Sequence, residues 1–412
     1  MTLLNIITFS AIQTAVTSLV IYYTSKRSLL RPAVVPLIAL TTDKTWSALD
    51  LFGHTQPLNP LMAAIVFGFG LHHFNLLCTG AIDVGDVKAD IRRTFYDGKD
   101  DQGGSEIPAS AAFRRTLYIA TSIRGIGTSY EVKNIAHGKE TSESRLKFLI
   151  RNIGIITAKY LVLDIMLYKP LTQEDSNRYF YEGSEYLFFR PKDIPPATIQ
   201  DVAKNLAIAL FACGPTGPWY IELQYRVVSV VSVVLGLSTP DQWPELFGSI
   251  TETYTLRGFW GKYWHQLFRW PMTSISTYTT RKLLRLRHPS LLERYINLML
   301  VFMISALLHV SMDGRAGFWP PQSGAFRCFP LQAVGIMVED GVQEIYRRVR
   351  GSKASTAREK LWTRVVGYVW AWGFMACVIT MYTFPLLRYQ NAAKNGVPIS
   401  VVRLVEGWVR LE

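Results

Sequence analysis

The stretch Ile296-Asn-Leu-Met-Leu-Val-Phe-Met-Ile-Ser-Ala-Leu-Leu-His-Val310 places one ionisable side chain, His309, near the end of a long apolar run. The run is long enough to form most of a membrane-spanning helix, which needs about 20 apolar residues. A polar group in hydrocarbon is costly unless it has a partner or a function. Upstream, Phe259-Trp-Gly-Lys-Tyr-Trp264-His265-Gln266 places a second histidine among aromatic rings. Two such histidines in an apolar chain suggest chemistry carried out within a bilayer.

The composition predicts an integral membrane protein. Of the 412 residues, 49% are hydrophobic and only 18% are charged, whereas soluble domains carry about 25% charged residues. We therefore predict an all-α, polytopic helical bundle of about eight transmembrane helices that encloses a reaction tunnel, folded as a single domain over residues 1–412. The clearest candidate spans are 3–23, 60–82, 148–168, 221–238, 292–311 and 365–387, and weaker ones are 34–53, 201–218 and 324–341.

The formal charge of +13 fits basic loops on the cytosolic side of a membrane protein. We predict that residues 83–147 form a polar cytosolic loop, and that the basic loops attract an anionic donor such as a coenzyme A thioester. No basic groove with interleaved aromatic residues is evident, so we expect no nucleic-acid partner.

His309 has two interpretations. It can be a hydrogen-bonded structural residue, or it can be a general base that takes the proton of an alcohol, because the pKa of a neutral imidazole lies near neutrality. Asp313 follows one helical turn later. It can orient the imidazole ring, or it can be a helix-end residue at the membrane interface.

His265 also has two interpretations. It can be a stacked interfacial histidine, or it can donate a hydrogen bond near a reacting carbonyl. The segment 254–290 around it mixes tryptophan with arginine and lysine. Such a segment either lies in the membrane interface or packs under the bundle and carries His265 to the mouth of a cavity.

A metal site is not expected. His72 and His73 are adjacent, but no third ligand is placed near them in the sequence, so a structural or pore-lining role is favoured. The four cysteines form no CxxC pair. No serine lies in a nucleophile-elbow setting, which favours direct acyl transfer without an acyl-enzyme.

The pattern Phe259-x4-Trp264-His265, followed by Leu307-Leu308-His309 in an apolar helix, resembles the membrane-bound O-acyltransferase superfamily. The His at 265 resembles the wax-synthase-like branch, and Gln332-Ala-Val-Gly-Ile-Met-Val-Glu-Asp340 is similar to a further segment of that branch. The resemblance is strongest over 250–342, the predicted catalytic core. It implies that His309 is the catalytic histidine and that His265 occupies the position of the second active-site polar residue.

The resemblance to fungal members implies acetyl transfer from acetyl-CoA to a hydroxyl of a hydrophobic terpenoid. We accordingly predict His309 and His265 as catalytic, and Trp260, Trp264, Gln266 and Asp313 as substrate-binding. The acyl-CoA is a co-substrate, and no bound cofactor is expected. The match of His309-Val-Ser-Met-Asp313-Gly314 to the HxxxDG signature of soluble plant-type acyltransferases is interpreted as a coincidence, because those enzymes fold as two soluble halves.

Three alternatives remain open at this point: a wax ester synthase that acts on long-chain alcohols, a membrane transporter, and a catalytically silent scaffold. A transporter would be expected to show internal repeats and paired intramembrane charges. We expect a multi-pass protein of the endoplasmic reticulum. The sequence does not specify its oligomeric state.

Overall fold

The computed structural model describes residues 2–49, 58–95, 106–137, 143–169, 172–188, 190–351, 357–389, 397 and 399–409. These residues are helical or lie in turns and loops, and their only β-type pairing is an isolated bridge between Ala136 and Glu245. The prediction of an all-α protein is confirmed for this part of the chain. Contacts divide the chain into two compact units, so a single domain over 1–412 stays a prediction.

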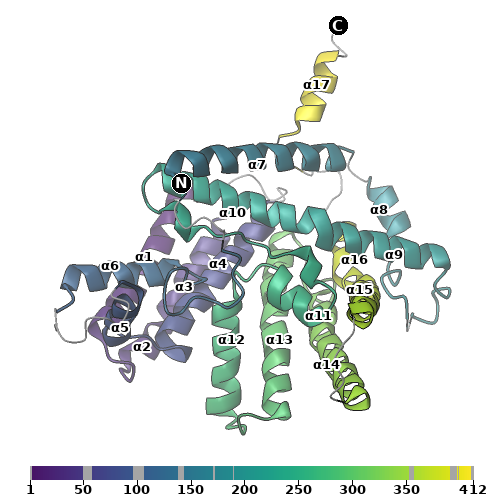
Figure 1. Cartoon of the computed structure of the whole chain (residues 1–412). Helices are drawn as coiled ribbons and strands as arrows, with labels where there is room; N and C mark the ends of the chain where they lie inside the picture. Colours follow the sequence, from purple (N-terminus) through teal and green to yellow (C-terminus); the bar gives the residue numbers. More distant parts are fainter. Residues whose placement is uncertain are drawn as a thin grey trace. The chain divides into compact units, whose positions relative to one another are not determined.

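The first unit comprises Met1–Gly53, Asn59–Lys133 and Gln266–Met312. The unit is built mainly of long apolar helices, and the helix that contains His309 is one of them (Figure 1). The elements are α1 (Thr2–Tyr23), α2 (Leu30–Ala33), α3 (Val35–Ser47), α4 (Leu58–Phe74), the π-helical turn η1 (Asn75–Thr79), α5 (Val84–Phe95), α6 (Ala109–Thr121), α12 (Arg269–Tyr278), the π-helical turn η6 (Thr279–Leu283) and most of α13 (Leu291–Arg315).

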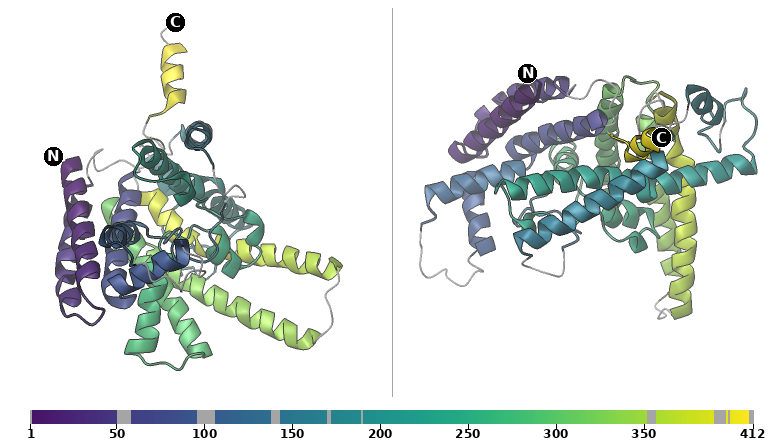
Figure 2. Two further views of the ribbon diagram at one scale, coloured as in Figure 1. Left: turned by 60° about the vertical axis from the view of Figure 1, so that its left-hand side comes forward. Right: turned by 90° about the horizontal axis from the view of Figure 1, so that it is seen from above.

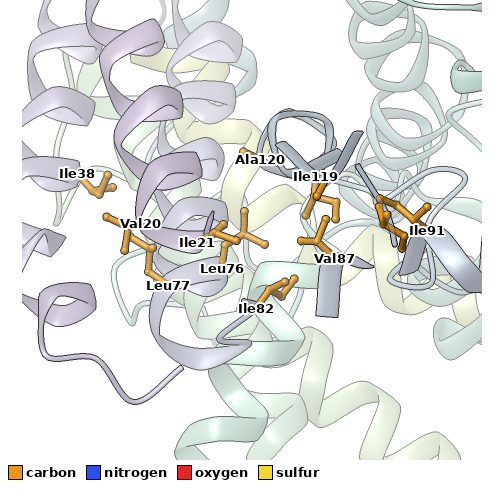
Figure 3. Packing of buried hydrophobic residues seen from close by; sticks show 12 residues of the cluster. Val20, Ile21, Ile38, Leu76, Leu77, Ile82, Val87, Ile91, Ile119 and Ala120 are labelled. Atoms are coloured by element: carbon orange, nitrogen blue, oxygen red, sulfur yellow. The ribbon is translucent and has the colours of Figure 1, made fainter. Parts of the chain in front are cut away.

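The core of the first unit joins helices that are distant in sequence. Ile21 of α1, Leu76 of η1 and Ile119 of α6 are almost completely buried, and Figure 3 shows them in one cluster with Val87 of α5. Complete burial of an aliphatic side chain stabilises the folded state by roughly 1.5–3 kcal/mol relative to leaving that side chain exposed to water. The cluster therefore fixes α5 and α6 to the end of α4.

Residues 83–147 are more ordered than the predicted polar loop. They contain α5 and α6, which are joined by an ion pair between Arg115 Nε and the buried Asp90 at 2.6 Å. Val87 and Ile91 lie one turn apart on the buried face of α5, so the polar composition concealed an amphipathic helix. Residues 96–105 and 138–142 of this segment lie outside the described residues.

The second unit comprises His54–Leu58, Asn134–His265 and Asp313–Glu412. Its elements are drawn in teal and in lime to yellow in Figures 1 and 2. They are α7 (Arg145–Leu167), α8 (Gln173–Tyr179), α9 (Ile199–Phe211), the π-helical turn η2 (Ala212–Thr216), α10 (Gly217–Val234), the 3₁₀ turns η3 (Pro240–Gln242) and η4 (Ile250–Glu252), α11 (Leu256–Gly258), the π-helical turn η5 (Phe259–Tyr263), the end of α13, α14 (Ala325–Arg350), α15 (Ala357–Val378), α16 (Thr380–Tyr389) and α17 (Val401–Val409).

Helices α7 and α10 pack together through a buried polar network. Arg226 donates to Glu222 at 2.7 Å and to Asn152 at 2.6 Å, and Lys159 of α7 forms an ion pair with Glu222. Asp164 of α7 accepts from the backbone amide of Val402 on another helix, α17, at 3.1 Å. Paired charges of this kind are the usual way in which apolar helices tolerate ionisable residues.

Four of the predicted spans are long and apolar enough to cross a membrane: Leu3–Tyr23, Pro60–Thr79, Leu291–Arg315 and Ala357–Tyr389. Within the described residues, the other predicted spans do not qualify. The segment 148–168 holds Arg151, Lys159 and Asp164, and the predicted span 34–53 contains the short helix α3, with its residues 50–53 outside the described part. The predicted span 201–218 is interrupted at Gly214, which departs from helical geometry inside η2.

Candidate active site

His309 lies on the inward face of α13. The residues Phe302, Ala306 and Asp313 recur with the spacing of one helix face, and all three are buried. His309 falls on the same face, whereas Leu307 points to the opposite side and is 47% exposed. The helix therefore directs its apolar surface outward and holds the imidazole on its protein-facing side.

A hydrogen bond within α13 fixes the state of the imidazole. The Nδ1 atom of His309 lies 2.7 Å from the carbonyl oxygen of Ser305, one turn earlier. A carbonyl only accepts, so Nδ1 carries the proton in the neutral ring and Nε2 carries the lone pair. This tautomer is the one that a general base needs if the reacting hydroxyl approaches Nε2.

A second face of α13 packs on the other helices of the first unit. Leu308 is 3% exposed and forms a cluster with Ala64 of α4 and with Phe268 and Met272 at the start of α12. Gln266 is also buried, and its Oε1 accepts from Arg269 Nη1 at 2.8 Å. These contacts hold the His309 helix against α4 and α12, and they show Gln266 fastening the start of α12.

The Trp264-His265 pair follows a π-helical turn in the second unit. The amide of Trp264 donates to the carbonyl of Phe259 at 2.8 Å, and at Trp264 the backbone becomes extended. Single π-helical turns are frequent at functional sites. The ring of Trp264 contacts those of Trp260 at 5.7 Å and His265 at 5.6 Å, and Phe247 packs edge-on against His265.

Helix α14 anchors this turn. Trp260 Nε1 donates to Gln332 Oε1 at 3.1 Å, and the carboxylate of Glu339 accepts from the backbone amide of Leu256 at 2.6 Å. Arg257 forms a two-pronged ion pair with Asp340. A carboxylate at the first turn of a helix satisfies amides that have no partner within the helix. The segment 332–340 thus positions the aromatic turn, which connects two stretches that the sequence singled out separately.

The preceding loop, residues 248–252, also contacts the π-helical turn η5. Lys262 donates to Glu252 at 2.8 Å, a hydrogen bond that raises the pKa of Lys262. The Gly248 amide donates to the Tyr263 carbonyl at 2.9 Å, and a Cβ at Gly248 would lie 2.1 Å from the Lys262 carbonyl oxygen. The segment 254–290 is therefore a series of short turns followed by α12 and the π-helical turn η6.

Asp313 lies in a hydroxyl cluster of the second unit. Its side chain is buried and accepts from Ser323 Oγ at 2.5 Å and from the Tyr382 hydroxyl at 3.0 Å. Asp313 lies near the end of α13, which ends at Arg315, and its printed hydrogen bonds reach hydroxyl groups. Whether Asp313 contacts substrate stays a prediction.

The predicted site residues thus fall into three groups. Trp260, Trp264 and His265 share one aromatic cluster, whereas His309 and Gln266 belong to the first unit and Asp313 to its own hydroxyl cluster. Sequence reasoning missed Ser323, Tyr382 and Phe247 altogether. These partners are distant in the chain from the residues they hold, and no local pattern marks them.

The paired histidines of α4 have a structural geometry. His72 and His73 contact the carbonyl oxygens of Ile119 and Ala120, in the last turn of α6, at 3.0 and 3.1 Å. Among the described residues, no group of three or more His, Cys, Asp or Glu side chains could hold a metal ion.

Comparison with known proteins finds a family model that matches part of this chain. Residues 243–331 match the model of the "Membrane bound O-acyl transferase family", and the matched range includes all six predicted site residues. No solved structure matches.

Several fungal proteins are similar to this chain over most of its length. Acetyltransferase ataH of Aspergillus terreus is 55% identical over 306 residues, which cover 74% of this chain and 100% of that protein. Acetyltransferase pyr8 of Aspergillus fumigatus is 33% identical and covers 94% of this chain and 89% of its own length. Acetyltransferase TRI7 of Fusarium sporotrichioides is 33% identical, over 68% of this chain and 64% of its own length. The resemblance read from the sequence is confirmed: this chain belongs to the membrane-bound O-acyl transferase family and is an O-acyltransferase.

Proposed function

We propose that this enzyme transfers an acetyl group from acetyl-CoA to a hydroxyl of a hydrophobic, terpenoid-type secondary metabolite. The names of the relatives support acetyl transfer, and the apolar helices support an acceptor that arrives from the membrane. The proposal includes a bundle of about eight spans around a tunnel, located in the endoplasmic reticulum.

His309 is the proposed general base, and one observation carries this assignment. The ring lies on the buried face of α13, and the Nδ1 bond to Ser305 leaves the lone pair on Nε2. A base in this position contributes about 10²–10⁴ in rate.

The proposed reaction is a direct transfer. Nε2 of His309 takes the proton of the acceptor hydroxyl while its oxygen attacks the thioester carbonyl. The tetrahedral intermediate then collapses, the carbon–sulfur bond breaks, and the CoA sulfur leaves with the proton that His309 held. His265 is a candidate donor to the oxyanion, since its ring is held by Trp264 and Phe247. Trp260, Trp264, Gln266 and Asp313 are proposed to shape the binding surface around the reactants. Exclusion of water would protect the thioester from hydrolysis.

The test is product analysis with the protein expressed in yeast microsomes. Acetyl-CoA and a long-chain acyl-CoA are each offered with a terpenoid alcohol and with a long-chain alcohol. The proposal predicts that the terpenoid acetate is the main product and that it is lost in the His309→Asn variant at equal protein level. Predominant formation of long-chain wax esters, or of no ester at all, would refute the proposed substrates.

A further inference from the structure

A groove of about 390 Å³ opens in the first unit beside the His309 helix. Every side chain that lines it carries a hydroxyl or a positive charge, and no carboxylate is among them. It runs from the end of η1 along α12 and η6, and its walls include Thr79, Thr273, Ser274, Thr277, Arg281 and Lys282. Methyl, methylene and ring carbons of these side chains form most of the surface, and its polar groups, which are hydroxyl and cationic, are suited to phosphate oxygens that accept hydrogen bonds and carry negative charge.

The hydroxyl wall of the groove is held in place by a hydrogen-bonded chain. Thr79 Oγ1 donates to Asn75 Oδ1 at 2.9 Å and accepts from Ser274 at 3.5 Å. Asn297 of α13 donates to Thr277 Oγ1 at 3.0 Å, so the proton of the Thr277 hydroxyl remains for a second acceptor. Asn297 in turn accepts from Ser276 at 2.7 Å. These bonds fasten the groove directly to α13, which runs beside α12 in Figure 1.

The cationic wall is also oriented. Arg281 Nε donates to Glu293 Oε1 at 2.8 Å, and the Glu293 side chain is only 5% exposed while that of Arg281 is 40% exposed. Glu293 therefore directs the guanidinium without lining the groove itself. A guanidinium beside an ammonium group is a common arrangement for phosphate recognition.

The groove is linked to the His309 helix through Asn297, which donates to the groove residue Thr277. Asn297 and His309 are separated by 12 residues of α13, which is about 18 Å along the axis. The arm of CoA between its diphosphate and its sulfur contains about a dozen bonds and extends to about 15 Å. The extended arm is comparable in length to this separation, so a donor whose phosphates occupy the groove near Thr277 would place its thioester toward the His309 end of α13.

We propose that this groove binds phosphate groups, and, resting on the proposed function, that they belong to the nucleotide part of the acyl-CoA donor. The phosphate of an anionic lipid headgroup has the same chemistry and is the second source that the experiment distinguishes.

The test compares wild-type protein with the Arg281→Gln/Lys282→Gln double variant, both purified in detergent. The dissociation constants of CoA and of phosphate-free pantetheine are measured by calorimetry, which does not depend on acetyl transfer. Loss of two charge-assisted contacts is expected to weaken CoA binding by ~10-fold or more while pantetheine binding stays unchanged. Arg285→Gln is the matched control, because it removes a charge from the same basic segment outside the groove lining.

A second arm measures binding to phosphatidylcholine vesicles with and without phosphatidic acid. Unchanged CoA affinity with loss of the preference for phosphatidic acid would support the groove and assign it to lipid. The proposal is overturned if neither ligand is affected, if pantetheine binding falls equally, or if Arg285→Gln has the same effect. Failure of the wild-type protein to transfer acetyl groups would refute the proposed function. The binding results would still show whether the groove binds phosphate groups.

Discussion

Two sets of histidines in the first unit look alike in sequence but differ in geometry. His72 and His73 of α4, like His309 of α13, lie in apolar helices and bond to backbone carbonyl oxygens. The α4 histidines use Nε2 to reach another helix, α6, whereas His309 uses Nδ1 to reach its own helix. The first arrangement ties two helices together, and the second holds a ring against its own helix, while in both the other ring nitrogen carries the lone pair.

The α4 histidines and His309 also differ in burial. His72 and His73 are 0% and 1% exposed, and their Nε2 atoms satisfy carbonyls in the last turn of α6, which lack partners within that helix. His309 is half-buried on the inner face of α13. The comparison teaches that complete burial and a bond to another helix mark the structural histidines, whereas partial burial and a bond within its own helix mark the candidate base.

The largest expected effect is at His309. Substitution His309→Asn keeps a donor near the position of Nδ1 but removes the base, so kcat is expected to fall by about 10²–10⁴, which equals about 2.7–5.4 kcal/mol in the barrier. Initial rates of acetyl transfer by purified protein measure this effect. A variant with near wild-type kcat would place His309 in the structural class with His72 and His73.

Substitution Asp313→Asn tests the neighbouring cluster. The Ser323 and Tyr382 hydroxyls both donate to Asp313, so the amide nitrogen of asparagine would face a donor. Stability is expected to fall by about 1–3 kcal/mol. Thermal unfolding in detergent measures the loss, and Tyr382→Phe, which removes only one donor, should cost less. Equal stability of all three proteins would contradict the role of this cluster.

Substitution His73→Phe should lower stability without lowering the rate, whereas His309→Asn should lower the rate. It preserves most of the ring volume and leaves the Ala120 carbonyl without its donor, so stability should fall by about 1–2 kcal/mol. The rate of transfer per folded molecule should be unchanged. Activity normalised to folded protein is the measurement, and a large fall in kcat with normal stability would break the comparison.

The smallest effect is expected at Leu307. Its side chain lies on the exposed face of α13, so Leu307→Ala should change stability by less than about 0.5 kcal/mol and leave the rate unaltered. Leu308→Ala is the matched substitution on a packed face and should cost about 2–4 kcal/mol. Similar losses for the two variants would show that the faces of α13 are assigned incorrectly.

Sequence alone could predict the helices that are defined by length and hydropathy, such as Leu3–Tyr23 and Leu291–Arg315. It could also predict the family, because Phe259, Trp264, His265 and His309 lie close enough in the chain to form a recognisable pattern. Helix α5 was missed although Val87 and Ile91 have helical spacing, because the charged residues around them suggested a loop.

The support of the site could not be predicted in the same way. Glu339 reaches Leu256 and Tyr382 reaches Asp313 across long stretches of chain. Such contacts depend on how helices pack, and a pattern of hydropathy does not specify which polar side chains will meet. The nitrogen that His309 uses for its backbone bond is likewise a matter of rotamer and ring orientation.

The most direct test of the central claim is the dependence of kcat on the acidity of the acceptor hydroxyl. A series of acceptors from aliphatic alcohols to phenols is compared in wild-type enzyme and in His309→Asn. If Nε2 removes the proton, the variant should recover much of its lost rate with phenols, while wild-type rates should vary little. Identical dependence in the two proteins would contradict the assignment of His309 as the base.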